Sequence, residues 1–166
     1  MLFTELNAIM PLVDVNQTVT SNTELNSINM ALYDHATFVI QFASTMVIAS
    51  TAKVVIESGS ADSGDVSTDV VFHYRLGTAS GATLSTAGNY GADTTASVYS
   101  IVSAADVAGH TLILEVDGDE LRSTSLGEVY NWITVDIESG ITTGTIAAYA
   151  ILSNPRYAAA SMPVAI

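Results

Sequence analysis

The sequence predicts an all-β fold, mainly antiparallel, in the form of a β-sandwich or jelly-roll-like single domain with one or two short helices. Three observations lead to this prediction: several short segments alternate between apolar and polar residues, turn-rich segments separate them, and helical periodicity is scarce. The 166 residues make one domain of ordinary size, long enough to bury a core without disulfides or a structural metal. The chain contains no cysteine.

The predicted strands carry apolar residues at every second position, which is the period of a half-buried strand. The clearest are residues 70–76 (VVFHYRL), 111–117 (TLILEVD) and 130–138 (YNWITVDIE). A set of about seven or eight strands is completed by residues 36–44, 53–58, 95–103 and 145–152. Many short strands divided by turns favour an antiparallel sandwich.

Helical signals are confined to short segments. Residues 21–33 offer Ser, Asn or Thr as an N-cap and a modest helical spacing of apolar residues, so we expect a short helix there. Residues 103–109 (SAADVAG) predict a single helical turn after Ser103, and the first nine residues are expected to be a short helix or frayed. None of these segments is long enough to connect parallel strands.

The whole chain, residues 1–166, is predicted to be a single β-rich domain, since no linker divides it. Residues 1–12 are a candidate N-terminal arm and residues 158–166 a candidate C-terminal arm. Residues 77–95, rich in Ser, Gly, Thr and Ala, are expected to form a long exposed loop and a candidate binding arm.

The charge balance argues against two classes of partner. Four basic residues stand against 17 acidic ones, a formal net charge of −13, and such a surface repels both nucleic acid and anionic membranes. Only 13% of the residues are charged while 49% are hydrophobic, so we expect a globular protein whose surface is partly covered by partners.

Residues 36–53 resemble a membrane span because their first charge comes late, but the segment is short for a bilayer and contains several polar residues. The N-terminal residues lack the basic region of a signal peptide, and Glu5 interrupts their apolar run. We therefore expect a protein that stays inside the cell that makes it or leaves in a particle.

No pattern in the sequence predicts catalysis, a cofactor or a metal. The histidines, His35, His73 and His110, follow neither a metal-binding nor a triad spacing, and no nucleophile elbow is present. His73 is expected on the exposed face of its strand, and His35 beside Asp34 is expected to make a hydrogen bond within a turn. An enzyme is the weakest interpretation.

Four acidic residues of the segment EVDGDE are candidate cation ligands: Glu115, Asp117, Asp119 and Glu120. Their spacing does not match a calcium loop of the EF-hand type, which needs glycine at the sixth position. We favour a strand that ends in an acidic turn, with cation binding as the alternative.

The candidate interface residues are Trp132, Pro155, Arg156 and Tyr157. Trp132 is expected to anchor the core or an interface, with stacking on a sugar as the alternative. Pro155 is expected to stop the last strand, and arginine and tyrosine are residue types favoured at interface hot spots. The alternative for Arg156 is a pair with an acidic residue of its own domain. The apolar arm after it is suited to lie along an adjacent subunit.

Four segments resemble a known family when taken in order: LYDHATFVIQFAS (residues 32–44), LEVDGDEL (114–121), YNWITVDI (130–137) and AAYAILSNPRYA (147–158). The chain is similar, over most of its length, to small proteins encoded near the major capsid protein in the head-gene region of tailed bacteriophages. Such proteins are head decoration, or cement, proteins.

The resemblance implies a non-enzymatic virion structural protein that binds the outer surface of the capsid lattice and stabilises it. It implies the major capsid protein as partner, a β-rich homo-oligomer, most simply a trimer, and a location on the capsid surface after synthesis in the host cytoplasm. No cofactor, nucleic acid or membrane is implied. Two alternatives stay open: a phage tail or neck adaptor component, and a carbohydrate-binding β-sandwich module.

Overall fold

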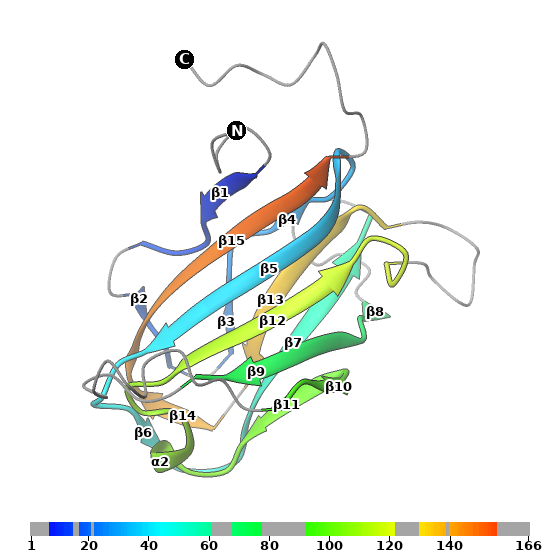
Figure 1. Cartoon of the computed structure of the whole chain (residues 1–166). Helices are drawn as coiled ribbons and strands as arrows, with labels where there is room; N and C mark the ends of the chain where they lie inside the picture. Colours follow the sequence, from blue (N-terminus) through cyan, green and yellow to red (C-terminus); the bar gives the residue numbers. More distant parts are fainter. Residues whose placement is uncertain are drawn as a thin grey trace.

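The computed structural model describes residues 7–14, 17–20, 22–60, 68–77, 92–121, 130–138 and 140–155. Within these residues two antiparallel sheets stack face to face, which confirms the predicted all-β sandwich (Figure 1). The sheets are called the larger and the smaller sheet below.

The larger sheet has the strand order β1-β15-β5-β12-β9-β10, with β2 also paired to β15. The bounds of these strands are β1 Ala8–Pro11, β15 Thr145–Pro155, β5 Tyr33–Phe42, β12 Thr111–Asp117, β9 Phe72–Leu76, β10 Thr94–Ala96 and β2 Gln17–Thr18.

The smaller sheet has the order β11-β7-β13-β3, with β4 paired to β13 and β8 to β7. The bounds of its strands are β11 Val98–Ile101, β7 Ala52–Gly59, β13 Trp132–Glu138, β3 Thr23–Glu24, β4 Ile28–Asn29 and β8 Thr68–Asp69. A separate pair joins β14 (Ile141–Thr143) to β6 (Val47–Ile48), and the one helix of the described residues is α2 (Ala104–Val107).

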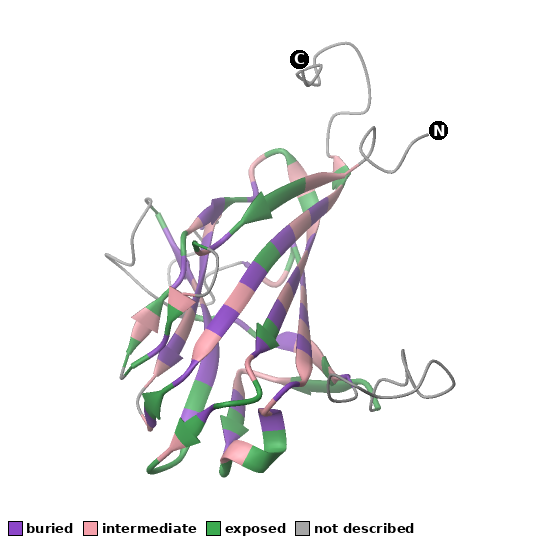
Figure 2. Cartoon of the chain, turned by 90° about the vertical axis from the view of Figure 1, so that its left-hand side faces the viewer, coloured by how far each residue is buried: buried purple, intermediate pink, exposed green. Residues whose placement is uncertain are grey.

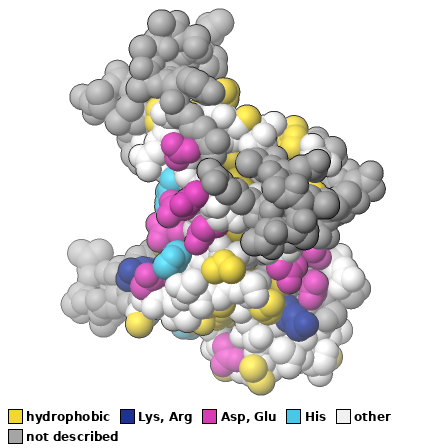
Figure 3. Space-filling view, turned by 90° about the vertical axis from the view of Figure 1, so that its right-hand side faces the viewer, with side chains coloured by type: hydrophobic (Ala, Val, Ile, Leu, Met, Phe, Trp, Pro, Cys, Tyr) yellow, Lys and Arg dark blue, Asp and Glu magenta, His cyan; other side chains and the backbone are white. Residues whose placement is uncertain are grey.

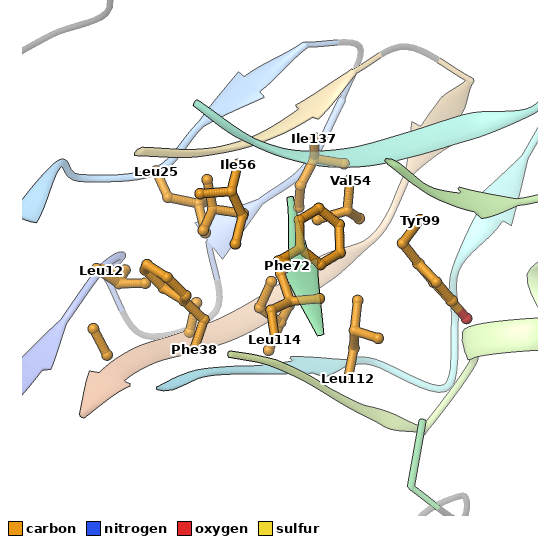
Figure 4. Packing of buried hydrophobic residues seen from close by; sticks show 14 of the residues in the cluster. Leu12, Leu25, Phe38, Val54, Ile56, Phe72, Tyr99, Leu112, Leu114 and Ile137 are labelled. Carbon is orange, nitrogen blue, oxygen red and sulfur yellow. The ribbon is translucent and has the colours of Figure 1, made fainter. Parts of the chain in front are cut away.

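The sheets form because alternate residues along each long strand are apolar and face the space between the layers. Figure 2 shows this alternation of buried and exposed residues along the strands. Phe38 and Leu114 of the larger sheet and Ile56 and Ile137 of the smaller sheet are almost fully buried in this space, where they belong to one continuous cluster (Figure 4). Burying each such side chain contributes roughly 1.5–3 kcal/mol.

The strands predicted from the alternation are confirmed, except that residues 95–103 are divided between β10 of the larger sheet and β11 of the smaller sheet. The helical turn at α2 is confirmed as well. Ser103 precedes α2, and its backbone N–H donates to the Asp106 carboxylate at 2.8 Å. Because this contact satisfies one of the backbone groups at the start of the helix, so short an element can form here.

The helix predicted over residues 21–33 is wrong. The segment instead forms β3 and β4, which both pair with β13. A helix would have placed Leu25, Ile28 and Leu32 on one buried stripe, but Leu32 is 56% exposed while the other two are buried. The backbone N–H of Leu25 donates to the carbonyl of Val135 at 2.9 Å, so pairing with the edge of β13 overrides a weak local preference.

The first nine residues were expected to be helical or frayed, which is wrong for Ala8 and Ile9, because they lie in β1 and pair with β15. In the expected loop 77–95, residues 78–91 lie outside the described residues, and Thr94 begins β10. Among the described residues, no helix has the length and apolar character needed to cross a membrane.

A candidate docking surface on the larger sheet

The outer face of the larger sheet, which points away from the core, carries an apolar row across four strands. The strand register places Pro11 of β1 opposite Tyr149 of β15, Tyr149 opposite Val39 of β5, and Val39 opposite Ile113 of β12. Residues directly opposite one another in an antiparallel sheet point to the same face. The row is therefore continuous from the edge strand to the fourth strand of the sheet.

A second apolar pair lies beside this row, because Ile9 of β1 stands opposite Ile151 of β15. Ile9 is 53% exposed and Tyr149 is 44% exposed. We call the combined surface the apolar stripe: Ile9, Pro11, Val39, Ile113, Tyr149 and Ile151. Exposed apolar groups gathered on one sheet face are typical of a binding surface.

Polar residues occupy the neighbouring part of the same face. His35 Nδ1 lies 2.7 Å from Asp117 Oδ1, and its Nε2 lies 3.6 Å from Glu115 Oε1. Glu115 stands opposite His73 in the pairing of β12 with β9, and His73 Nδ1 lies 3.2 Å from Asp93 Oδ2. These five residues are called the histidine–carboxylate column.

The column borders the apolar stripe directly. Arg75 of β9 stands opposite Ile113, so the row of the stripe ends at a charged residue, whose Nε lies 3.9 Å from Asp93 Oδ1. Figure 3 shows acidic and histidine side chains gathered along one side of the molecule. The outer face thus combines an uncharged row with three carboxylates and two histidines along one side and Arg75 at one end.

The acidic turn predicted after residues 111–117 is confirmed, since β12 ends at Asp117. The Asp117 N–H donates to the Glu120 carboxylate at 3.0 Å, and the Glu120 N–H donates to the Asp117 carbonyl at 3.0 Å. Asp117 and Asp119 line a hollow of ≈ 330 Å³ with Asp34 and Asn154. Among the described residues, no three histidine or acidic side chains are placed to hold a metal ion.

The histidines have different surroundings. The turn contact expected for His35 is wrong, because this residue lies within β5 and bonds across to Asp117. His73 is on the outer face of β9, as its alternation predicted, and His110 Nδ1 lies 2.7 Å from the carbonyl of Gly77. Pairing between distant strands therefore decides the partners of His35 and His73.

The two predicted interface residues that the structure describes, Trp132 and Pro155, lie on different sheets. Trp132 begins β13, is half-buried, and stands opposite Gly59 and Asn29 of the smaller sheet. Pro155 ends β15 and stands opposite Tyr33 in the larger sheet. Arg156 and Tyr157 lie outside the described residues.

Two ionisable groups outside the stripe are perturbed by burial. Burial raises the pKa of Asp136 above its ordinary value, with further contributions from the negative charges of Glu138 and Glu24. Its Oδ1 is buried and has no hydrogen-bond partner among the described residues. Burial, followed by the charge of Asp106, raises the pKa of Tyr99 to about 12.

The apolar stripe is not among the sites predicted from the sequence. The alternation of apolar and polar residues along β5 and β12 predicts that Val39 and Ile113 lie on the outer faces of their strands, so this part of the stripe could be predicted from the sequence. The register that aligns them with Tyr149 depends on pairing between strands far apart in the chain, which a single sequence does not reveal.

No protein-family model matches the sequence, and no curated protein matches it. Among solved structures, the chain is similar to the crystal structure of the SPBc2 prophage-derived protein YomS. The two share 11% sequence identity with a TM-score of 0.45, and the match covers 88% of this chain and 91% of that one.

Proposed function

We propose that this chain is a non-enzymatic structural protein of a bacteriophage particle, a head decoration protein that binds the outer surface of the capsid lattice and stabilises it. The observation that carries the proposal is the apolar stripe, of which half the residues are exposed and the other half are half-buried on the outer face of a hydrogen-bonded sheet. Because the sheet fixes the positions of its side chains, the stripe binds a partner with little loss of conformational freedom.

The sequence supports the same proposal in two ways. Four segments, taken in their order along the chain, resemble phage head decoration proteins. Charged residues make up only 13% of the chain. Interface cores are depleted in charge, so a subunit covered by neighbours tolerates such a composition. The proposed partner is the major capsid protein, and the proposed assembly is a homo-oligomer, most simply a trimer, because a symmetric oligomer matches a symmetric lattice site.

The test is a binding experiment with purified protein and capsids that lack it. Mass photometry gives the oligomeric state, and co-sedimentation gives the number of copies per capsid. Saturation at a fixed number of copies supports a decoration protein. Binding to isolated tails or necks, with bare capsids, replaces the proposal with an adaptor role. Binding to glycans, lost in Trp132→Ala, replaces it with a carbohydrate-binding module.

A further inference from the structure

We propose that the apolar stripe docks a protein other than a second copy of this chain, one with an apolar centre and Lys or Arg side chains placed to face the histidine–carboxylate column. This inference rests on the proposed function, and it identifies the docking face and the chemistry of the partner's site on the capsid.

The centre of the surface sets the first requirement. From Pro11 to Ile113, the row crosses four strands without a charged residue. Tyr149 lies in the middle of the row and is 44% exposed, so its ring is available to a partner. Aromatic residues surrounded by smaller apolar groups are typical anchors of protein interfaces. The partner must therefore offer an apolar patch here.

The border sets the second requirement. The carboxylates of Asp117, Glu115 and Asp93 are 59%, 39% and 42% exposed, so each has part of its surface open to a partner. Besides His35 and His73, Arg75 is the one Lys or Arg of the described residues that lies beside them. Since like charges at an interface cost free energy, the partner needs cations opposite the column.

The described residues of a second copy do not meet this requirement. The chain has four Lys or Arg residues and a net charge of −13. Lys53 lies 3.9 Å from Glu138 on the smaller sheet, and Arg75 already faces Asp93. Docking two copies through this face therefore adds acidic charge to acidic charge. The charges of the described residues on this face therefore favour a different, basic partner over a second copy.

The test compares matched pairs of variants in co-sedimentation with capsids that lack the protein. Tyr149→Ser alters the stripe, and Val102→Ser is its control, because Val102 is 70% exposed and lies outside both sheets. Asp117→Lys alters the column. Asp69→Lys is its control, because it makes the same charge change at an exposed residue of β8. Thermal melts establish that all four variants fold.

We expect Tyr149→Ser and Asp117→Lys each to weaken capsid binding about tenfold or more, while both controls bind like the wild type. Raising the salt concentration weakens wild-type binding, because it screens the contacts of the column. A folded Tyr149→Ser or Asp117→Lys protein that binds like the wild type overturns the inference and leaves the proposed function standing.

Two further outcomes are decisive in other ways. Wild-type protein that ignores the capsids overturns the proposed function, and the partner assigned here falls with it. Sedimentation velocity of the free proteins, without capsids, gives the other outcome. If the wild type is an oligomer and the Tyr149→Ser protein is a monomer, a second copy occupies the stripe, and the inference is overturned.

Discussion

His35 and Asp117 face each other across the pairing of β5 with β12, and a ring nitrogen of His35 lies 2.7 Å from a carboxylate oxygen of Asp117. The two residues are 82 positions apart in the sequence. Their contact is therefore a product of strand register, and the same register holds the rest of the outer face of the larger sheet in place.

Removing this contact is expected to cost little stability. Asp117→Asn should lower the free energy of unfolding by less than about 1 kcal/mol, because the pair is partly exposed to solvent. Urea unfolding measures the difference, with Asp119→Asn as the control for the same change in the adjoining turn. A loss above about 2 kcal/mol would show that the pair supports the fold itself.

Asp136→Asn is expected to stabilise the protein at neutral pH. The pKa of Asp136 is raised from an ordinary value of 3.8, so the native state keeps this proton at pH values where the unfolded chain has lost it. Stability therefore falls as pH rises from 3.8 through the raised pKa, and the loss persists above it. Glu24 stands directly opposite Asp136, and like charges so placed are destabilising.

We expect a gain of about 0.5 kcal/mol for Asp136→Asn at pH 7, and little or none in acid below the ordinary pKa of aspartate. Urea unfolding across this pH range measures both. Asp14→Asn, at an exposed loop position, is the control for the change in net charge. An equal gain at all pH values would contradict ionisation as the cause.

Tyr99→Phe is expected to protect the protein at alkaline pH. Tyr99 is 9% exposed, and burial raises the pKa of its phenol from an ordinary 10.0 to about 12, so the native state favours the neutral form. The resulting contribution to stability is complete below pH 10.0 and is lost as pH rises through about 12. Phenylalanine does not ionise and keeps the edge-to-face packing against Tyr74, at 5.0 Å between ring centres.

The measurement is urea unfolding of Tyr99→Phe and wild type at a neutral and at an alkaline pH. The variant should lose less stability between the two conditions. Tyr149→Phe, at an exposed phenol, is the control and should follow the wild type. If Tyr99→Phe and wild type lose stability equally, burial of this phenol does not set the alkaline limit.

Gly140→Ala is expected to destabilise the fold by about 2 kcal/mol. Gly140 adopts a φ of +81°, and a Cβ there would press on the carbonyl of Ser50 and lie 2.6 Å from that of Thr51. The Gly140 carbonyl also accepts the N–H of Ala49 at 2.8 Å, so the backbone cannot turn away without losing this bond.

Thermal unfolding checks the effect of Gly140→Ala. In the control, Gly144→Ala, the added methyl meets the flexible side chain of Met46 and no backbone atom among its nearest contacts, so a smaller loss is expected. Equal melting temperatures for Gly140→Ala and wild type would show that the connection between β13 and β14 relaxes freely.

Much of the fold could be predicted from the sequence because a period of two is a direct property of a half-buried strand. Phe38 and Leu114 are buried while their neighbours Val39 and Glu115 are on the outer face, as the alternation indicates. The helix predicted around Leu25 is wrong, because short strands at a sheet edge take their structure from a partner that local sequence does not show.

The candidate site was less predictable. The acidic turn after Asp117 was visible, since all its residues are close in the sequence. The alignment of Tyr149 with Val39 could not be predicted, because it depends on the order and register of the strands. Because each strand contributes only one or two residues to this surface, no single segment of the sequence contains a pattern that predicts it.

The position of β5 also has a consequence for biosynthesis. β5 lies between β12 and β15, and β15 is the last strand of the described chain. As the chain leaves the ribosome, one hydrogen-bonding edge of β5 therefore stays unpaired until β15 has been synthesised, near the end of the described chain. An open strand edge is a template for pairing with other chains. We therefore expect variants that slow the pairing of β5 with β15 to aggregate during synthesis, before the fold is complete.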